Sequence, residues 1–304
     1  MSARQILCRM ALLAILFTQT RLAAAADAAA ASSASEGPKY ALRYKFKPGD
    51  VIRTQVWHQV SLETTISGTT QTADTTSGSV KVWRIQDIDS DGRVTLEHSV
   101  ESVDMRQKLS DRQEVTYNSK TDKQPPPGYE NVAKSVGVPL TMFVIDSSGN
   151  LLKRIDKRSN PPADAQNSQV AVPLPERQVA RGESWNVPQD VTITLEDGET
   201  KVIKTRQHYT LDSVTNGVAT ISVITQILTP VNNPKIQSQL VQRMTQGTIR
   251  FDMNAGRVLS QKLELDERVL GFQGPESSLH YLGRFTEEYL PPEPKTASKA
   301  ATKK

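Results

Sequence analysis

Alternation of apolar and polar residues is the feature that most limits what this chain can fold into. Tyr40, Leu42, Tyr44 and Phe46 alternate with small or charged residues, and a period of two places such groups on one face of a β-strand. Similar runs follow at 56–62, 80–88, 94–100, 142–145, 191–195, 219–227, 249–253, 263–269 and 279–289. Turn motifs with glycine separate them. This pattern predicts an all-β, mainly antiparallel fold. Short helices are expected only at 129–136 and 234–245.

The turn motifs recur in the same order in both halves of the chain. KPGDVI at Lys47 is echoed by ARGESW at Ala180, and the runs that start at Ile85 and Phe143 are echoed at Leu211 and Ile249. The matching glycines form three pairs, Gly49/Gly182, Gly92/Gly217 and Gly149/Gly256. Three echoes in register predict a duplication into two curved sheets or half-barrels.

This pattern divides the chain into repeats and flanks. We expect a signal peptide at 1–26, an Ala/Ser-rich linker at 27–38, the first β repeat at 39–158, a polar linker at 159–168, the second β repeat at 169–290 and a Pro/Lys tail at 291–304. The two terminal flanks lack the apolar periodicity of a packed segment, so we expect both to be flexible.

The N-terminus has the three parts of a secretory signal. Arg4 and Arg9 give a basic start, residues 10–17 form an apolar run, and an Ala-x-Ala site ends at Ala26. The run is shorter than the ~20 apolar residues that cross a bilayer. We therefore expect an exported, signal-cleaved protein, periplasmic or extracellular, without a transmembrane segment.

Composition excludes several kinds of chemistry. Cys8 is the only cysteine and lies in the signal, so the mature chain has no disulfide, thiolate nucleophile or cysteine-bound metal. Cleavage removes three of the 37 basic residues, Arg4, Arg9 and Arg21, while all 33 acidic residues stay, so the formal net charge falls from +4 to +1. A charge this small gives no electrostatic basis for nucleic-acid binding.

The strongest candidate for a metal site is the segment DIDSDGRVTLEH. Asp87, Asp89, Asp91 and Gly92 occupy positions 1, 3, 5 and 6 of an EF-hand calcium loop. His98 stands at position 12, where the loop needs a bidentate carboxylate. The flanks read as strands, so a hairpin turn is the simpler interpretation, with weak ion binding by Asp87, Asp89 and Asp91 as the alternative.

Two histidines are the candidates for a ligand-binding site. His58 and His98 each fall on the apolar side of their strand's alternation. They fit either a small polar site or, more simply, histidines bonded to backbone within the sheet.

The sequence contains none of the common catalytic or cofactor-binding motifs. The chain has no G-x-S-x-G, no H-E-x-x-H and no phosphate-binding glycine loop. We therefore expect a protein that is not an enzyme and needs no cofactor.

The turn-and-strand motifs also carry a resemblance to a known family. The segments YALRYKFKPGDV, FVIDSSGNLL and GTIRFDMNAGRVLSQKLEL resemble an uncharacterised family of secreted β-rich proteins from planctomycete-type bacteria, a domain of unknown function. The resemblance implies export and a β fold, and it nominates no site residues.

These features lead to a functional hypothesis with alternatives. Curved open sheets offer a concave apolar face, so we expect an exported binding or carrier module of the cell envelope, for a lipid or another apolar ligand. The alternative is a structural or assembly protein of the envelope, partnered by an envelope protein. A hydrolase of envelope polymer ranks third.

Overall fold

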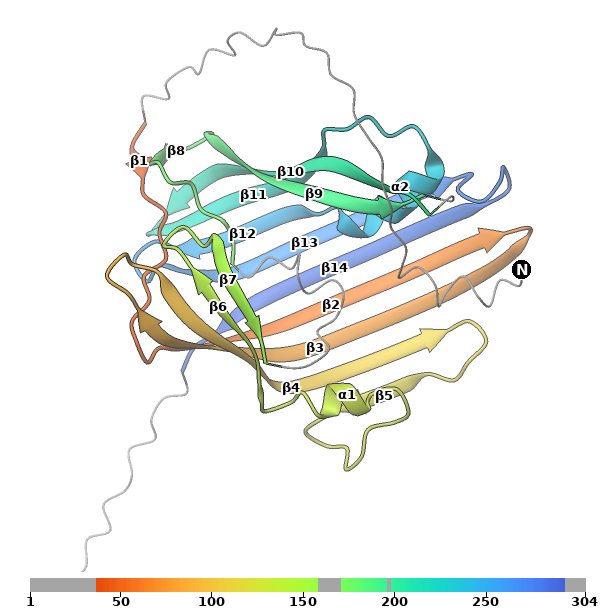
Figure 1. The fold of residues 1–304 in the computed structure, drawn as a ribbon, viewed down its shortest axis with the longest axis horizontal. Coiled ribbons are helices and arrows are strands. Elements are labelled where there is room, and N and C mark those ends of the chain that lie inside the picture. Colours follow the sequence, from red (N-terminus) through yellow and green to blue (C-terminus); the bar gives the residue numbers. More distant parts are fainter. Residues whose placement is uncertain (1–36, 158–170, 196–197, 293–304) are drawn as a thin grey trace, which may run out of the picture.

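Twelve strands form one continuous antiparallel sheet in the computed structural model, which describes residues 37–157, 171–195 and 198–292 (Figure 1). The sheet order is β7-β6-β4-β3-β2-β14-β13-β12-β11-β10-β9, with β5 paired to β4. The strands are β2 (Val51–Ile66), β3 (Thr69–Ile88), β4 (Val94–Leu109), β5 (Val115–Asn118), β6 (Pro139–Ile145), β7 (Leu151–Asp156), β9 (Ser184–Thr194), β10 (Thr200–Thr215), β11 (Val218–Ile227), β12 (Gln246–Asp252), β13 (Arg257–Leu270) and β14 (Ser278–Leu290). The prediction of an all-β antiparallel fold is confirmed.

The two halves of the chain join edge to edge. Strand β2 of the first half pairs along its length with β14, the last strand, so that His58 faces Phe285. The boundary predicted at 159–168 lies outside the described residues, as do the signal at 1–26 and most of both terminal flanks. The repeats therefore share one sheet and a continuous network of backbone hydrogen bonds.

The same order of elements occurs in both halves. Gly49 donates its N–H to the carbonyl of Ile85 at 2.9 Å, and Gly182 donates to Leu211 at 2.7 Å, each just before the first strand of its half. Gly49 and Gly182 have φ of 86° and 83°, a left-handed conformation that favours glycine. The other two glycine pairs lie in the β3–β4 and β10–β11 turns and in the β6–β7 and β12–β13 turns.

The two predicted helices are present but short. Strands β5 and β6 are connected through α1 (Glu130–Ala133), and β11 and β12 through α2 (Pro234–Leu240) followed by the 3-10 turn η3 (Val241–Arg243). Asn233 caps α2 by accepting the N–H of Lys235 at 2.8 Å. None of the helices in the described part of the chain has the length and apolar character needed to span a membrane.

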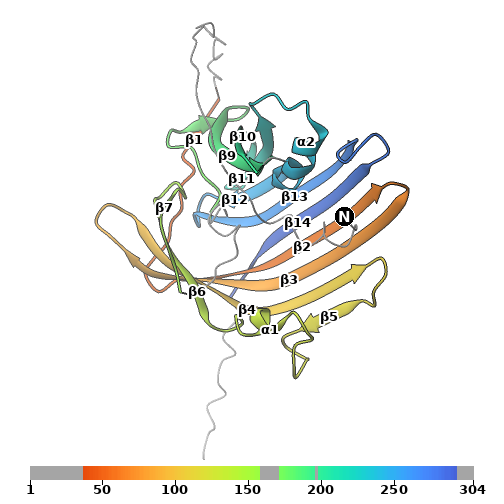
Figure 2. The same cartoon turned by 45° about the vertical axis from the view of Figure 1, so that its right-hand side comes forward.

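The sheet is curved, and its two faces differ in polarity. On β10, Ile203, Tyr209 and Leu211 are buried on the concave face, whereas Lys204 and Arg206 alternate with them on the convex face. Figure 2 shows that the ends of the sheet curl toward one side, where β1 (Lys39–Tyr40), β8 (Val179–Ala180) and α2 also lie. The largest core cluster therefore forms on the concave side.

Residues 40–46 are predicted as a strand, but only the first of them, Tyr40, pairs with a neighbouring strand. Lys39 and Tyr40 pair with Ala180 and Val179, but Tyr44 donates its N–H to Ser147 at 3.0 Å and Lys45 donates to Gly256 at 3.1 Å. These two acceptors lie in equivalent turns of the two halves. The segment therefore ties both repeats together, and its backbone groups are satisfied by turns instead of a neighbouring strand.

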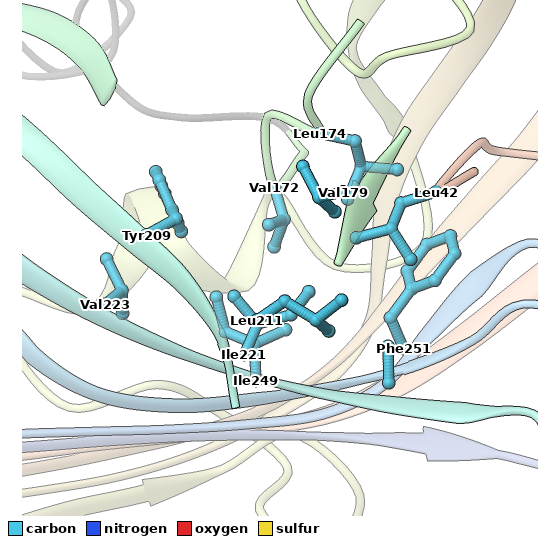
Figure 3. Close-up of a cluster of buried hydrophobic side chains, with 11 residues drawn as sticks. Leu42, Val172, Leu174, Val179, Tyr209, Leu211, Ile221, Val223, Ile249 and Phe251 are labelled. Atoms are coloured by element: carbon cyan, nitrogen blue, oxygen red, sulfur yellow. The ribbon is translucent and has the colours of Figure 1, made fainter. Parts of the chain in front are cut away.

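The largest core cluster lies beneath this segment (Figure 3). Side chains from outside the main sheet pack onto β10, β11 and β12. The covering residues are Leu42, Val172, Leu174 and Val179, and the sheet residues are Tyr209, Leu211, Ala219, Ile221, Val223, Ile249 and Phe251. At the other end of the concave face, α2 and η3 cover Ile203, Leu265 and Leu279.

Candidate functional site

A small cavity of about 80 Å3 lies on the concave face between the two halves. Its roof consists of Tyr44, Phe46 and Val172, from the two segments that cover the sheet. One wall comes from the first half, with Trp83 and Leu96 among its residues, and the floor from β2, β13 and β14. The lining is mostly apolar, so the cavity is a pocket for a hydrocarbon group with a few polar atoms at its floor.

The roof is held by one buried tyrosine. The hydroxyl of Tyr44 donates to the carbonyl of Val172 at 3.1 Å and accepts the N–H of Val172 at 3.0 Å. Its ring stacks on Phe46 at 5.2 Å between centroids and meets the edge of Phe251 at 5.5 Å. Burial raises the pKa of Tyr44 far above its ordinary value, so the hydroxyl stays neutral. Because the two covering segments are bonded through this side chain, the roof is a defined surface.

A carboxylate lies at the floor. One oxygen of Glu287 accepts the hydroxyl of Thr54 at 2.8 Å, and the other accepts the side-chain amide of Gln261 at 2.9 Å. The side chain of Glu287 is only 12% exposed. Lys81 places its Nζ 3.9 Å from Glu287 Oε1, an ion pair that is too long for a hydrogen bond. The floor thus holds a fixed negative charge with both oxygens already bonded.

One cation, Arg257, lines the pocket on the side of β13. Arg257 donates from Nη1 to the hydroxyl of Tyr289 at 2.9 Å, and its guanidinium lies 4.5 Å from the centre of that ring. This arrangement combines a hydrogen bond with a cation–π contact. Arg257 is therefore positioned by its own aromatic partner.

The concave face continues beyond the pocket as a partly exposed strip. Lys81 lies 5.8 Å from the centre of the Phe285 ring, which in turn lies 6.4 Å from His58. Phe285 is half-buried and His58 is exposed. Partial removal from water lowers the pKa of His58. The strip joins an aromatic surface to Lys81, which lies outside the pocket lining and 3.9 Å from Glu287 at the floor.

His98 has a different environment from His58. Its ring lies 4.6 Å from Trp83 and 6.5 Å from Phe143. Burial, reinforced by the positive charges of Lys81 and Arg154, lowers its pKa from 6.5 to about 4. Within the part of the chain that the structure describes, its buried Nε2 atom has no hydrogen-bond partner.

The two candidate histidines do not meet. His98 lies opposite Trp83, which lies opposite Ile52, so His98 is level with a residue six positions before His58 on β2. Six residues of strand span roughly 20 Å. They belong to one face but not to a shared site.

The three candidate calcium ligands lie at the β3–β4 turn. Asp89 accepts the backbone N–H groups of Asp91 and Arg93, both at 2.9 Å. The guanidinium of Arg93 lies 3.2 Å from Asp91 and 3.9 Å from Asp89, and Asp87 belongs to β3. Among residues 37–157, 171–195 and 198–292, no three histidine, cysteine or acidic side chains gather as a metal would require. The geometry is that of a hairpin turn closed by its own aspartate.

Sequence reasoning missed the charged residues in and beside the pocket, Glu287 and Lys81. Glu287 shares the parity of Phe285 and Tyr289, so an acid on an apolar face was a readable signal. Lys81 was hidden because its neighbours Val80 and Val82 suggest that it faces outward, whereas those valines are buried on the convex face.

Comparisons with known proteins give a family of unknown function and weak structural similarity. A family model, DUF6263, a family of unknown function, matches residues 164–267, most of the second repeat. No curated protein matches the chain.

Two solved structures are similar to it. One, described as lipid-protein interactions in lipovitellin, has 14% identity and a TM-score of 0.46, with 81% of this chain and 26% of that chain covered. The other is DynF from the dynemicin biosynthesis pathway of Micromonospora chersina, with 10% identity, a TM-score of 0.24 and coverage of 93% and 98%. This chain thus spans about a quarter of the lipovitellin chain, and similarity at this level transfers no function.

Proposed function

We propose that the protein is an exported binding or carrier module for a small amphiphile such as a single-chain lipid. The observation that carries the proposal is the apolar pocket on the concave face, roofed by Tyr44, whose floor residue Glu287 lies 3.9 Å from Lys81 at the start of the strip. The largest core cluster and the apolar pocket both lie on the concave face, which favours that face as the surface for an apolar ligand. The signal-like segment at 1–26 supports export.

The size of the pocket favours an elongated ligand. A cavity of about 80 Å3 is well below the roughly 300–1,000 Å3 of pockets that enclose a whole small molecule. It therefore accepts one end of a chain, and the rest of the ligand lies along the exposed strip. This arrangement suits a carrier, because a partly exposed ligand is released without unfolding of its site.

The test fills the pocket and measures ligand binding. Ala171 lines the pocket beside the roof, so Ala171→Phe places a ring where the chain end would lie. Isothermal titration calorimetry with dodecanol is expected to show binding to the signal-cleaved protein and at least tenfold weaker binding to this variant. Ala133→Phe, in α1 and outside the pocket lining, is the matched control and is expected to bind normally. Absence of dodecanol binding, or equal binding to the filled variant, would remove the proposal.

An assembly role has one supporting observation. Strand β7 is an edge of the sheet and exposes Leu151, Leu152 and Ile155, and an exposed apolar edge strand favours pairing with another copy. Native mass spectrometry of the full chain and of Leu152→Lys tests this role. A dimer that the variant dissociates supports assembly, and a monomer in both excludes self-association through β7.

A further inference from the structure

The two repeats place different chemistry at equivalent positions of the concave face. Trp83 pairs with His98 across β3 and β4, and Tyr209 pairs with Val223 across β10 and β11. Each aromatic residue lies two positions after a polar one, Lys81 in the first half and Gln207 in the second. The first half therefore has a lysine and a histidine where the second has a glutamine and a valine.

A third pair of equivalent positions also has a cation in the first half and a glutamine in the second. Arg154 faces Phe143 across β6 and β7, and Gln261 faces Ile249 across β12 and β13. Arg154 is held by Asp156, with its Nη2 at 2.7 Å and its Nε at 2.9 Å from one carboxylate oxygen. Arg154 is thus hydrogen-bonded to its own carboxylate, whereas Lys81 has only the 3.9 Å ion pair with Glu287 and is the cation that remains open to a ligand.

Lys81 has the properties of a binding cation. Its side chain is 28% exposed, although it lies on an apolar face beside Phe285. An ammonium group has three donors, and the structure gives Lys81 no hydrogen bond to any described residue, with its nearest carboxylate oxygen at 3.9 Å. Both oxygens of that carboxylate, on Glu287, are already bonded to Thr54 and Gln261. The donors of Lys81 therefore remain available to another acceptor.

The neighbouring histidine gives a second, independent observation. His98 has a buried Nε2 atom without a partner in the described ranges. A buried polar atom without a hydrogen bond is costly unless something satisfies it when the site is filled. His98 lies diagonally across the β3–β4 pair from Lys81, since Lys81 pairs with Val100. The two groups border the same part of the concave face.

We propose that Lys81, with His98 beside it, binds the anionic head group, a carboxylate or a phosphate, of an amphiphile whose chain end lies in the apolar pocket. This inference rests on the proposed function and names its ligand class. The charge of Lys81 matches an anion, and the adjoining Phe285 and Trp83 provide apolar surface for the chain. Glu287 stays with its own donors and repels an anion from the floor, which directs the head toward the exposed side of Lys81.

The experiment compares ligands that share a dodecyl chain and differ in their head group. Dodecanoate, dodecyl phosphate, dodecanol and dodecylamine are titrated into the signal-cleaved protein by calorimetry at mildly alkaline pH, where a carboxylate is ionised. Lys81→Gln introduces the residue that stands at the equivalent position of the second half, and Lys81→Arg keeps the positive charge. Lys262→Gln is the control, because Lys262 is exposed on the convex side of β13. Inorganic phosphate without a chain is titrated separately.

The expected result is a loss specific to anionic heads. Lys81→Gln is expected to weaken dodecanoate and dodecyl phosphate roughly 10- to 100-fold, the effect of one charged hydrogen bond, and to leave dodecanol unchanged. Lys81→Arg and Lys262→Gln are expected to bind like the original protein, and inorganic phosphate to bind far more weakly than dodecyl phosphate. A circular dichroism spectrum matching the original checks that each variant folds.

The other outcomes separate this inference from the proposed function. If dodecanol and dodecanoate bind equally well and Lys81→Gln changes neither affinity, the proposal that Lys81 binds an anionic head group is wrong. The proposed carrier function would then still stand. Tightest binding of dodecylamine would assign the head to Glu287 and also overturn it. Inorganic phosphate binding as tightly as dodecyl phosphate would show a site for a free anion. If no dodecyl compound binds, the proposed function itself fails.

Discussion

The two halves of the sheet share one backbone pattern but use their concave faces differently. In the second half Tyr209, Leu211 and Ile221 are at most 1% exposed beneath the covering segments. In the first half Ile85 and Leu96, the counterparts of Leu211 and Ile221, are also buried, but Trp83 and His98 are only half-buried and the side chain of Lys81 is 28% exposed. One copy of the repeated framework thus seals its aromatic position within the core, and the other leaves it partly open to solvent.

The cause of the difference is where the covering segments lie. Leu42, Val172 and Val179 pack on strands of the second half, and only Phe46 and Ala171 reach the cluster of the first. Because the cover is unequal, apolar surface in the first half stays accessible. That inequality leads to the predictions that follow.

The largest expected effect comes from truncating equivalent aromatic residues. Tyr209→Ala removes a side chain that is 1% exposed and is expected to lower the free energy of unfolding by about 3–5 kcal/mol. Trp83→Ala, in the open half, is expected to cost less than half as much and to weaken ligand binding instead. Urea denaturation of both variants measures the difference, and equal losses would contradict the contrast between the halves.

The next effect is a pH dependence that comes from His98 in the first half. His98 has its pKa lowered from 6.5 to about 4, so the folded state favours its neutral form. Its stabilising contribution is therefore full above pH 6.5 and is lost as the pH falls through about 4, by up to about 3 kcal/mol. His98→Val, which copies the second half, is expected to flatten the unfolding free energy between these values. An unchanged pH profile in the variant would refute the assignment.

A smaller effect is expected at the turns that hold the roof. Gly256 has φ of 62°, and a Cβ there would lie 2.4 Å from the backbone nitrogen of Lys45. Gly182 has φ of 83° with nothing within 4 Å. We expect Gly182→Ala to cost about 1 kcal/mol from backbone strain alone, and Gly256→Ala about 2 kcal/mol or more because Lys45 must move. Thermal unfolding compares the two, and similar losses would mean that Lys45 is not held at this turn.

The smallest effect concerns the β3–β4 turn, where calcium binding is the alternative. Asp89→Ala removes two hydrogen bonds in an exposed hairpin and is expected to cost about 1 kcal/mol. Because Arg93 already pairs with Asp89 and Asp91, calcium is expected to leave the Tm of the original protein unchanged. A calcium-dependent rise in Tm that Asp89→Ala abolishes would instead establish an ion site.

The sequence predicts local structure in this protein better than long-range pairing. Alternation placed most of the strands and the inward parity of Leu42, Ile221 and Phe251, because a period of two records which face is buried. Strand β10 lies outside the predicted runs. The edge-to-edge joining of β2 and β14 was not predictable, since no local pattern records which strands pair. The same holds for the segment at 40–46, whose hydrogen bonds go to distant turns.

The candidate site was predictable only in part. His58 and His98 were placed on the correct face by parity, but the pocket depends on a roof from Tyr44 and Val172, which only the fold brings together. Lys81 was concealed by its two valine neighbours. A site assembled from four distant segments leaves little trace in any one of them.

Native mass spectrometry of the protein purified from its own host tests the central claim most directly. The account predicts an extra mass of a few hundred daltons that disappears on denaturation and is absent from Ala171→Phe. It also predicts that the released compound is an amphiphile with an acidic head. A bare polypeptide mass for the original protein, under conditions that retain non-covalent ligands, would contradict the claim that the open concave face carries a ligand.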